Sequence, residues 1–238
     1  IGVIKNEWNA VEWYTKAAKK GNVYAQYNLG SCYEYGIGIS KNEKKAVEWY
    51  TKAAERGYVV AQNRLGRCYE YGIGISKDGN KAFEWYTKAA EKGYAYAQNN
   101  LGYCYRDGKN ITQNEKKAFE WYTKAAEQGY ADAQNNLGYC YRNGTGIFKD
   151  EKKAVEWYIK AAKQGHAGAQ NSLGDCYRFG IGVSKDEKKA VEWYTKAAER
   201  GYTYAQKNLG DCYRFGIGVS QDKIKASEWI TKSGIRVY

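Results

Sequence analysis

The order of apolar and polar residues along the chain predicts an amphipathic helix over residues 44–55. At 100° per residue the apolar side chains fall on one arc of roughly 160°, and Lys and Glu take the other side. We call this element helix B and expect its wide apolar face to be buried. The residues of that face are Ala46, Val47, Trp49, Tyr50, Ala53 and Ala54.

A second helix, helix A, is predicted over about residues 23–35. Ala25, Leu29, Cys32 and Tyr33 share one face of it at helical spacing. Gly30 lies on the same helix, and we expect its missing side chain to let a neighbouring helix approach closely. The two elements together predict a helix pair.

Residues typical of helix ends flank both elements. Gly36 and Gly57 stand where a left-handed C-cap would end helix A and helix B. An Asn or Asp precedes each helix B at the N-cap position, where its side chain can accept from a free backbone N–H. The N-cap candidates are Asn42, Asp78, Asn114, Asp150, Asp186 and Asp222.

The helix pair recurs with a step of 36 residues, as the spacing from Cys32 to Cys68 shows. Six cysteines keep this step, and so do the Trp residues from Trp13 to Trp229. Six complete units and one partial unit account for the chain, which is the signature of a repeat architecture. The cysteines are Cys32, Cys68, Cys104, Cys140, Cys176 and Cys212.

A lone pair of short amphipathic helices cannot bury so wide a face, so neighbouring units must stack. The predicted fold is all-α, a right-handed α–α superhelix, or solenoid, of two-helix repeats. We expect one array over residues 1–238. Residues 1–20 form a partial unit that holds the second helix only, and residues 21–236 form six full repeats.

The two ends of the chain depart from the repeat. Ile1-Gly2-Val3 aligns with the turn at residues 37–39, so we interpret the chain as a piece of a longer array. In the last helix B, Ser227, Ile230 and Ser233 replace larger apolar or helix-favouring residues. We therefore expect the last repeat to act as a cap.

Two sequence words recur in register: Ala-x-x-x-Leu-Gly-x-Cys-Tyr-x-x-Gly-x-Gly-Ile and Lys-Ala-Val-Glu-Trp-Tyr-Thr-Lys-Ala-Ala-Glu-x-Gly. On these words nearly the whole chain resembles the Sel-one-like repeat family, a subclass of the tetratricopeptide-like superfamily. The resemblance implies antiparallel helix pairs, a concave surface lined by A helices, and an adaptor or scaffold role in protein complexes. Each unit carries one Cys, unlike the disulfide-stapled members with two. Lys109-Asn110 replaces Ile-Gly, so the turn of the third unit is expected to differ.

Composition narrows the class of protein further. The chain is 43% hydrophobic and 27% charged, which excludes a disordered or collagen-like protein. It has no run of eighteen apolar residues, so we expect no membrane association.

Candidate chemistry is sparse, and we expect no catalytic site, no metal and no cofactor. Equivalent cysteines on neighbouring A helices should stand about 8–10 Å apart or more, beyond disulfide reach, so free and mostly buried thiols are expected. The chain has one histidine, His166, which we expect in an exposed turn, so no Cys/His pair or zinc set can be assembled. The repeated carboxylates, such as Glu48, lie on the solvent side of helix B. The prediction is a non-enzymatic protein.

One face of helix A varies among the copies, at the places of residues 24, 28, 31 and 35, which fall within about 60° on a helical wheel. We call these places the A-helix strip, expect it to be exposed, and predict that it binds a peptide or partner protein. Asn amides suit contact with an extended peptide backbone, and Tyr gives rigid anchors. That Asn merely belongs to the repeat consensus is an equal alternative. The predicted binding residues are Asn28, Arg64, Arg67, Tyr96, Asn100, Tyr103, Asn136, Tyr139 and Asn208.

The formal net charge of +12 gives an alternative function, a basic helical-repeat protein that binds RNA. Arg106 and its equivalents in later units form a basic row that, with aromatics, would track a phosphate backbone. Against this, the Lys pairs at the starts of helix B are interleaved with Glu, so a nucleic-acid partner is disfavoured. A third hypothesis is that the chain regulates a catalytic domain encoded outside it.

Unpaired cysteines and the lack of a leader lead us to expect a cytoplasmic protein, or one in the host cytoplasm if a pathogen encodes it. A monomer is expected, with self-association through the exposed array ends as the alternative. Trp8 supports that alternative, because it replaces Lys44 on the solvent side of helix B.

Overall fold

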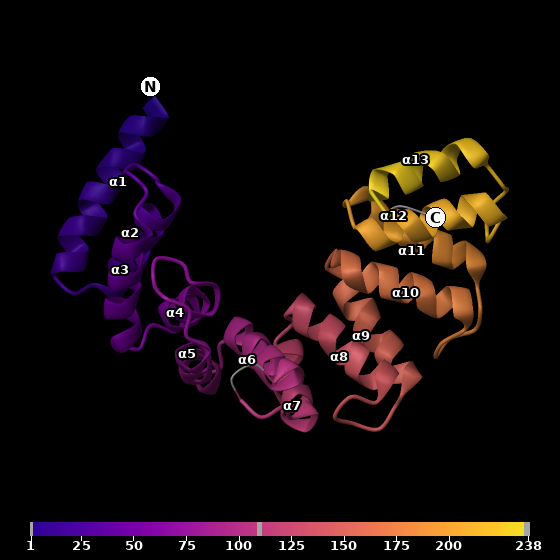
Figure 1. The fold of residues 1–238 in the computed structure, drawn as a ribbon, viewed down its shortest axis with the longest axis horizontal. Helices are drawn as coiled ribbons and strands as arrows, with labels where there is room; N and C mark the ends of the chain where they lie inside the picture. The colour runs from indigo at the N-terminus through magenta and orange to yellow at the C-terminus, as the bar shows by residue number, and fades with distance from the viewer. Residues whose placement is uncertain (1, 109–110, 236–238) are drawn as a thin grey trace. The chain divides into compact units, whose positions relative to one another are not determined.

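The computed structural model describes residues 2–108 and 111–235, which form thirteen α-helices and no strand (Figure 1). The all-α prediction is confirmed, and the helices predicted over 23–35 and 44–55 match the observed bounds within one residue. The turn expected to differ at Lys109-Asn110 lies outside the described residues.

The helices of the two kinds alternate along the chain. The A helices are α2 (Val23–Tyr35), α4 (Val59–Tyr71), α6 (Ala95–Asp107), α8 (Ala131–Asn143), α10 (Ala167–Phe179) and α12 (Thr203–Phe215). The B helices are α1 (Gly2–Lys19), α3 (Glu43–Glu55), α5 (Gly79–Glu91), α7 (Glu115–Glu127), α9 (Glu151–Lys163), α11 (Glu187–Glu199) and α13 (Lys223–Ser233).

The chain divides into two compact units, residues 1–114 and 115–238. The first contains α1 to α6 and the second α7 to α13, and within each unit successive helices pack against one another (Figure 1). The helix α1 begins at Gly2, so residues 2 and 3 are helical although they align with the turn at 37–39. The turn at 37–39 lies close against α1, because a Cβ built on Gly38 would lie 2.5 Å from the carbonyl oxygen of Glu7.

The apolar core lies between each helix B and the helix A that follows it. Tyr50 of α3 shares one buried cluster with Leu65 and Cys68 of α4. The same cluster recurs in the second unit around Tyr158 and Tyr194. Because each cluster draws its residues from two successive repeats, a helix pair buries its apolar face only when the next pair stacks on it.

Two kinds of glycine allow this close stacking. A Cβ at Gly30 would lie 2.7 Å from ring atoms of Tyr50, so the close approach predicted at Gly30 is confirmed. Gly74 has a φ of 66° in the turn between α4 and α5, and a Cβ there would overlap the carbonyl oxygen of Glu43 in the preceding helix B. Only glycine meets both demands at Gly74, because side chains disfavour positive φ and no space is left for one.

Side-chain to backbone hydrogen bonds fasten the repeats and fix the helix ends. Gln62 Nε2 of α4 donates to the buried carbonyl oxygen of Ala54 at 3.0 Å, so a polar side chain satisfies the end of the preceding helix B. Arg56 reaches back one repeat and donates to the carbonyl oxygen of Gly21 at 2.7 Å. The predicted N-caps are confirmed at Asn42, Asp78, Asp150, Asp186 and Asp222.

Candidate functional site

The outer positions of the A-helix strip carry exposed aromatic side chains in both units. Their exposed fractions run from 50% at Tyr139 to 63% at Phe215, which is high for rings of this size. Rigid helices therefore present rows of large rings to solvent, as partner-binding surfaces do. These rings are Tyr24, Tyr35, Tyr71 and Tyr96 in the first unit and Tyr139, Phe179, Tyr204 and Phe215 in the second.

The inner position of the strip, that of Asn28, lies deeper than we expected. Asn28, Asn100 and Asn208 are half-buried, and Asn136 is only 7% exposed. The expected exposure of Asn136 is therefore wrong. The bonds made by the equivalent amides of Asn100 and Asn208 show that this position faces the stacked repeats rather than solvent.

Two of these amides bond to the preceding repeat. Asn100 Nδ2 donates to Asn63 Oδ1 at 2.9 Å in the first unit, and Asn208 Nδ2 donates to Asn171 Oδ1 at the same distance in the second. The acceptors Asn63 and Asn171 are buried. The amides thus connect successive A helices, a structural use that sequence reasoning did not foresee.

Arg64, a predicted binding residue, is engaged within the protein. Its Nε donates to Glu34 Oε2 at 2.8 Å, and its Nη2 contacts Glu34 Oε1 and the Tyr35 hydroxyl. The guanidinium also lies 5.5 Å from the centroid of the Tyr35 ring. Tyr50 donates its hydroxyl to the same carboxylate at 2.7 Å. Glu34 is 5% exposed, so this is a buried ion pair between repeats, and burial lowers the pKa of Arg64.

The other predicted residues of the first unit stay near solvent. Arg67 is exposed, with its guanidinium 5.9 Å from the centroid of the Tyr71 ring. Tyr96 stacks on Tyr94 with 5.4 Å between ring centroids. Tyr103 is half-buried and faces a pocket described below. These residues offer a mixed aromatic and basic surface.

Hydroxyl groups from helix B reach the base of the strip, which sequence reasoning missed. The buried ring of Tyr86 directs its hydroxyl to Glu70 Oε2 at 2.6 Å, and Tyr194 donates to Asp175 Oδ1 at 2.7 Å. Burial raises the pKa of Tyr86 and Tyr194 far above its ordinary value, so both remain donors. The available signal was Tyr rather than Phe at this place of helix B, because a buried Tyr hydroxyl needs a partner.

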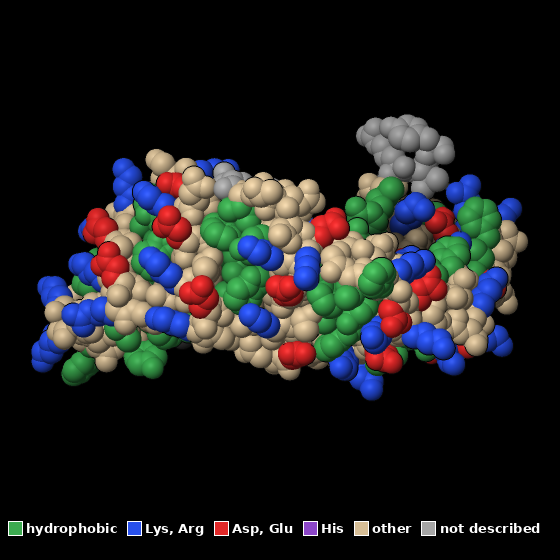
Figure 2. Space-filling view, turned by 90° about the horizontal axis from the view of Figure 1, so that it is seen from below, with side chains coloured by type: hydrophobic (Ala, Val, Ile, Leu, Met, Phe, Trp, Pro, Cys, Tyr) green, Lys and Arg blue, Asp and Glu red, His purple; other side chains and the backbone are tan. Residues whose placement is uncertain are grey.

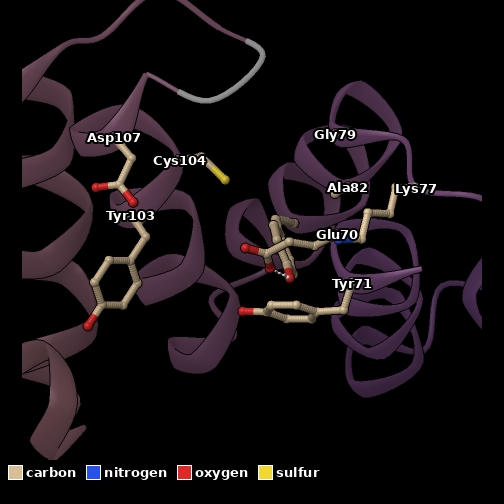
Figure 3. Close-up of a pocket in the computed structure, with 9 residues that line it drawn as sticks. Glu70, Tyr71, Lys77, Gly79, Ala82, Tyr103, Cys104 and Asp107 are labelled. Atoms are coloured by element: carbon tan, nitrogen blue, oxygen red, sulfur yellow. Dashed lines mark hydrogen bonds between the residues drawn. The ribbon is translucent and has the colours of Figure 1, made fainter. Parts of the chain in front are cut away.

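A pocket of about 420 Å³ opens in the first unit between α4, α5 and α6. Figure 3 shows the carboxylate of Glu70 extending from α4 into the space before α6, with Tyr71 below it and Tyr103 and Asp107 on the far side. The pocket therefore combines carboxylates with aromatic rings. Its lining residues are Glu70, Tyr71, Lys77, Gly79, Ala82, Tyr86, Tyr103, Cys104 and Asp107.

The basic row that suggested RNA binding is partly neutralised. Arg106 Nε donates to Asp107 Oδ1 at 2.8 Å, and Arg142 Nη1 lies 3.9 Å from Asp175 Oδ2. On the face shown in Figure 2, Lys and Arg side chains are interspersed with Asp and Glu. Neither observation favours a nucleic-acid partner, because binding a phosphate backbone needs a surface whose charges are mainly positive.

The six cysteines are free, as predicted; Cys104 is half-buried and the other five are buried. Burial raises the pKa of Cys68 to about 11, which makes its thiol a poor nucleophile at neutral pH. Within residues 2–108 and 111–235, no group of three or more His, Cys, Asp or Glu side chains is arranged to hold a metal ion.

His166 is not the exposed turn residue that we expected. Its Nδ1 accepts from the backbone N–H of Ala169 and caps α10, and its Nε2 lies 3.0 Å from Asp132 Oδ1. The side chain of His166 is 22% exposed, because His166 directly precedes α10 and its ring lies against Asp132 of the preceding helix A, α8. The hydrogen bond from His166 lowers the pKa of Asp132.

None of the described helices combines the length and apolar character that a bilayer crossing needs. The stacked helix pairs and their 36-residue period define an α-solenoid repeat protein of the tetratricopeptide-like class. The Sel1 repeat family matches residues 1–22, 23–58, 59–94, 95–130, 131–166, 167–202 and 203–234, so the chain belongs to this family.

Solved structures agree with this assignment. A protective antigen present in uropathogenic Escherichia coli strains, with an SLR fold, is 39% identical over 96% of this chain and 49% of its own, with a TM-score of 0.91. The chain thus spans about half the length of that antigen. A Sel1 repeat protein from Oxalobacter formigenes is 38% identical over 91% of this chain and 86% of its own, with a TM-score of 0.86. An immunity protein from Pseudomonas aeruginosa, 22% identical over 89% of this chain and 80% of its own, shares the fold at a TM-score of 0.56.

No curated protein matches the sequence. Proteins of the Sel1 repeat family are generally non-catalytic scaffolds for protein interactions.

Proposed function

We propose that the chain is a non-enzymatic scaffold that holds a peptide or a segment of a partner protein on its A-helix strip. The observation that carries the proposal is the row of half-exposed rings on the A helices, such as Tyr96 and Tyr139. Rings held on rigid helices lose little conformational entropy on binding and dominate interface energetics. A soluble protein rarely exposes so many of them without a partner.

Three of the four Asn side chains predicted to bind a peptide remain available for that role. The Asn100 and Asn208 amides each use one N–H for the neighbouring repeat, and an amide offers a second N–H and a carbonyl oxygen. Asn28, Asn100 and Asn208 therefore stay in the proposed surface. Asn136 leaves it, because its side chain is buried.

The test selects ligands from a random peptide display library on the immobilised chain and measures their affinity by calorimetry. Tyr96→Ala and Tyr139→Ala, each measured alone, should weaken a selected peptide about tenfold or more if the ring is an anchor. The matched control is Phe148→Ala, which removes a ring that is 92% exposed in a turn outside the strip. Affinities lowered equally by all three changes, or by none, would refute the proposal.

We further propose that the chain acts as a monomer in a reducing compartment. Six free cysteines in one chain support such a compartment, because thiols persist where glutathione keeps them reduced. Trp8 and Trp13 are 63% and 70% exposed on α1, so they are the surface through which self-association would occur. Sedimentation of the chain and of its Trp8→Lys variant tests this, and a concentration-dependent dimer lost in the variant would overturn the monomer.

A further inference from the structure

Arg64 shows how this fold recognises a guanidinium. Its side chain lies between two repeats, where Glu34 accepts a two-pronged contact, the Tyr35 ring lies beside the planar group, and Tyr50 orients the carboxylate from below. A carboxylate that accepts from two guanidinium nitrogens and an aromatic ring beside the same group is a strong arrangement for Arg. The residues that receive the guanidinium, Glu34, Tyr35 and Tyr50, all come from one repeat, and the guanidinium comes from the next.

The same three receiving residues recur one repeat later. Glu70, Tyr71 and Tyr86 stand 36 residues after Glu34, Tyr35 and Tyr50, and Tyr86 donates to Glu70 as Tyr50 does to Glu34.

The residue that would supply the guanidinium is different. Asn100 stands where Arg64 stands in the previous repeat, and its amide bonds to Asn63 instead. An Asn side chain is too short to reach the Glu70 carboxylate as Arg64 reaches Glu34.

The pocket of about 420 Å³ is found at this place. Its charged lining residues are Glu70, Lys77 and Asp107, and the Asp107 carboxylate accepts from Arg106. Among the described residues, Glu70 accepts from Tyr86, and no Lys, Arg or His nitrogen lies within 4 Å of its carboxylate. A half-buried carboxylate in such surroundings gains most from a cation that brings its own donors.

We propose that this pocket binds an arginine side chain of the partner, with its guanidinium on Glu70 and against Tyr71 as Arg64 lies on Glu34 and Tyr35. This rests on the proposed function, because it names a feature of the peptide that the strip would hold. Arg is favoured over Lys because only the planar guanidinium matches a carboxylate edge and an aromatic face together. The pocket is specific to one repeat, since from the third repeat onward the place of Glu70 is taken by Arg106, Arg142, Arg178 and Arg214.

Two peptide pools test the proposal on the full chain. One pool has four random residues on each side of a fixed Arg, and the other has citrulline in its place, which keeps the shape and removes the charge. The Arg pool should bind the wild-type chain at least about tenfold more tightly, the scale of one charge-assisted contact. Glu70→Gln should abolish the preference while preserving the acceptor for Tyr86.

A self-filling variant gives a second check. Asn100→Arg should place the protein's own guanidinium on Glu70 and suppress binding of the Arg pool about tenfold, the scale of the contact that it replaces. The matched control is Asn208→Arg. Asn208 makes the same hydrogen bond as Asn100, but in its surroundings Arg178 takes the place of Glu70, so that place holds no carboxylate to receive the new guanidinium. It should leave the preference for Arg unchanged. Thermal melting of each variant confirms that it is folded.

The half-buried thiol of Cys104 lines the pocket and reports where the probe binds. N-acetyl-arginine amide should slow alkylation of Cys104 by N-ethylmaleimide, and the citrulline analogue should not. If both pools bind equally to the wild type, the arginine pocket is refuted and the strip stands. If neither pool binds, both proposals fail. A preference for Arg that survives Glu70→Gln, or no protection of Cys104, would place the Arg elsewhere and overturn the inference.

Discussion

The ring of Tyr86 occupies the space in which a side chain at Gly66 would begin. A Cβ built on Gly66 would lie 2.7 Å from Cδ1 and Cε1 of Tyr86 and 3.3 Å from the carbonyl oxygen of Ala82. Because Gly66 has no Cβ, the ring of Tyr86 from α5 can lie directly against the backbone of α4. In this position its hydroxyl reaches Glu70, which is also on α4. The contact between Gly66 and Tyr86 therefore affects both the packing of α4 on α5 and the hydrogen bond to Glu70.

Gly66→Ala should therefore destabilise the protein by about 1–3 kcal/mol, the usual cost of overpacking, although Ala favours helix more than Gly does. Urea unfolding followed by circular dichroism measures the change. In a Tyr86→Ala background the same substitution should cost much less, because the clashing ring is gone. Additive effects of the two changes would contradict the proposed contact.

Arg64→Asn should destabilise the first unit by roughly 3–5 kcal/mol, because it leaves the buried Glu34 carboxylate without its cation. Hydrogen exchange of the α2 and α4 amides, together with thermal melting, measures the loss. Arg67→Asn on the same helix is the control and should change stability by no more than about 0.5 kcal/mol, since Arg67 is exposed. Equal effects would show that the inter-repeat ion pair is unimportant.

Stability should fall at alkaline pH because burial raises the pKa of Cys68, Cys176 and Cys212 to about 11. A folded-state pKa above the unfolded value of 9.0 favours folding of the protonated thiol, so this contribution is complete below pH 9 and is lost as pH rises to about 11. The loss is roughly 2–3 kcal/mol per thiol at most. Denaturant unfolding at pH 8, 9, 10 and 11 measures it. Replacing the three cysteines with Ala should make the curve shallower between pH 9 and 10, where the tyrosines of the unfolded chain ionise less than its cysteines do, and an unchanged slope would exclude the thiols as a cause.

Cys104 should be the first cysteine to react with N-ethylmaleimide at pH 7.5, because it is half-buried where the other five are buried. Peptide mapping after brief labelling identifies the modified site. Mild urea should remove the difference by opening the stack. Equal labelling of all six thiols in the native protein would mean that the repeats open faster than the reagent reacts.

The helix pairs could be predicted because their signals are local and repeated six times. The arc that contains Tyr50, the glycine at 30 and the caps such as Asn42 each depend on neighbours within one turn or one repeat. The exposure predicted for the outer positions of the A-helix strip is confirmed, as Tyr96 and Tyr139 show. The exposure predicted for its inner position is not, because amides there, such as Asn100, bond to the preceding repeat.

The sequence by itself determined the period, the two helices of each repeat and the free cysteines, because these follow from spacing and from side-chain type. Only the tertiary structure decided what each variable residue does. Arg64 and Asn100 occupy the same place in successive repeats, yet one reaches a buried carboxylate and the other bonds to Asn63. The difference arises because a stacked repeat exposes each side chain to partners 30 to 37 residues away, and the length of that side chain decides which partner it reaches.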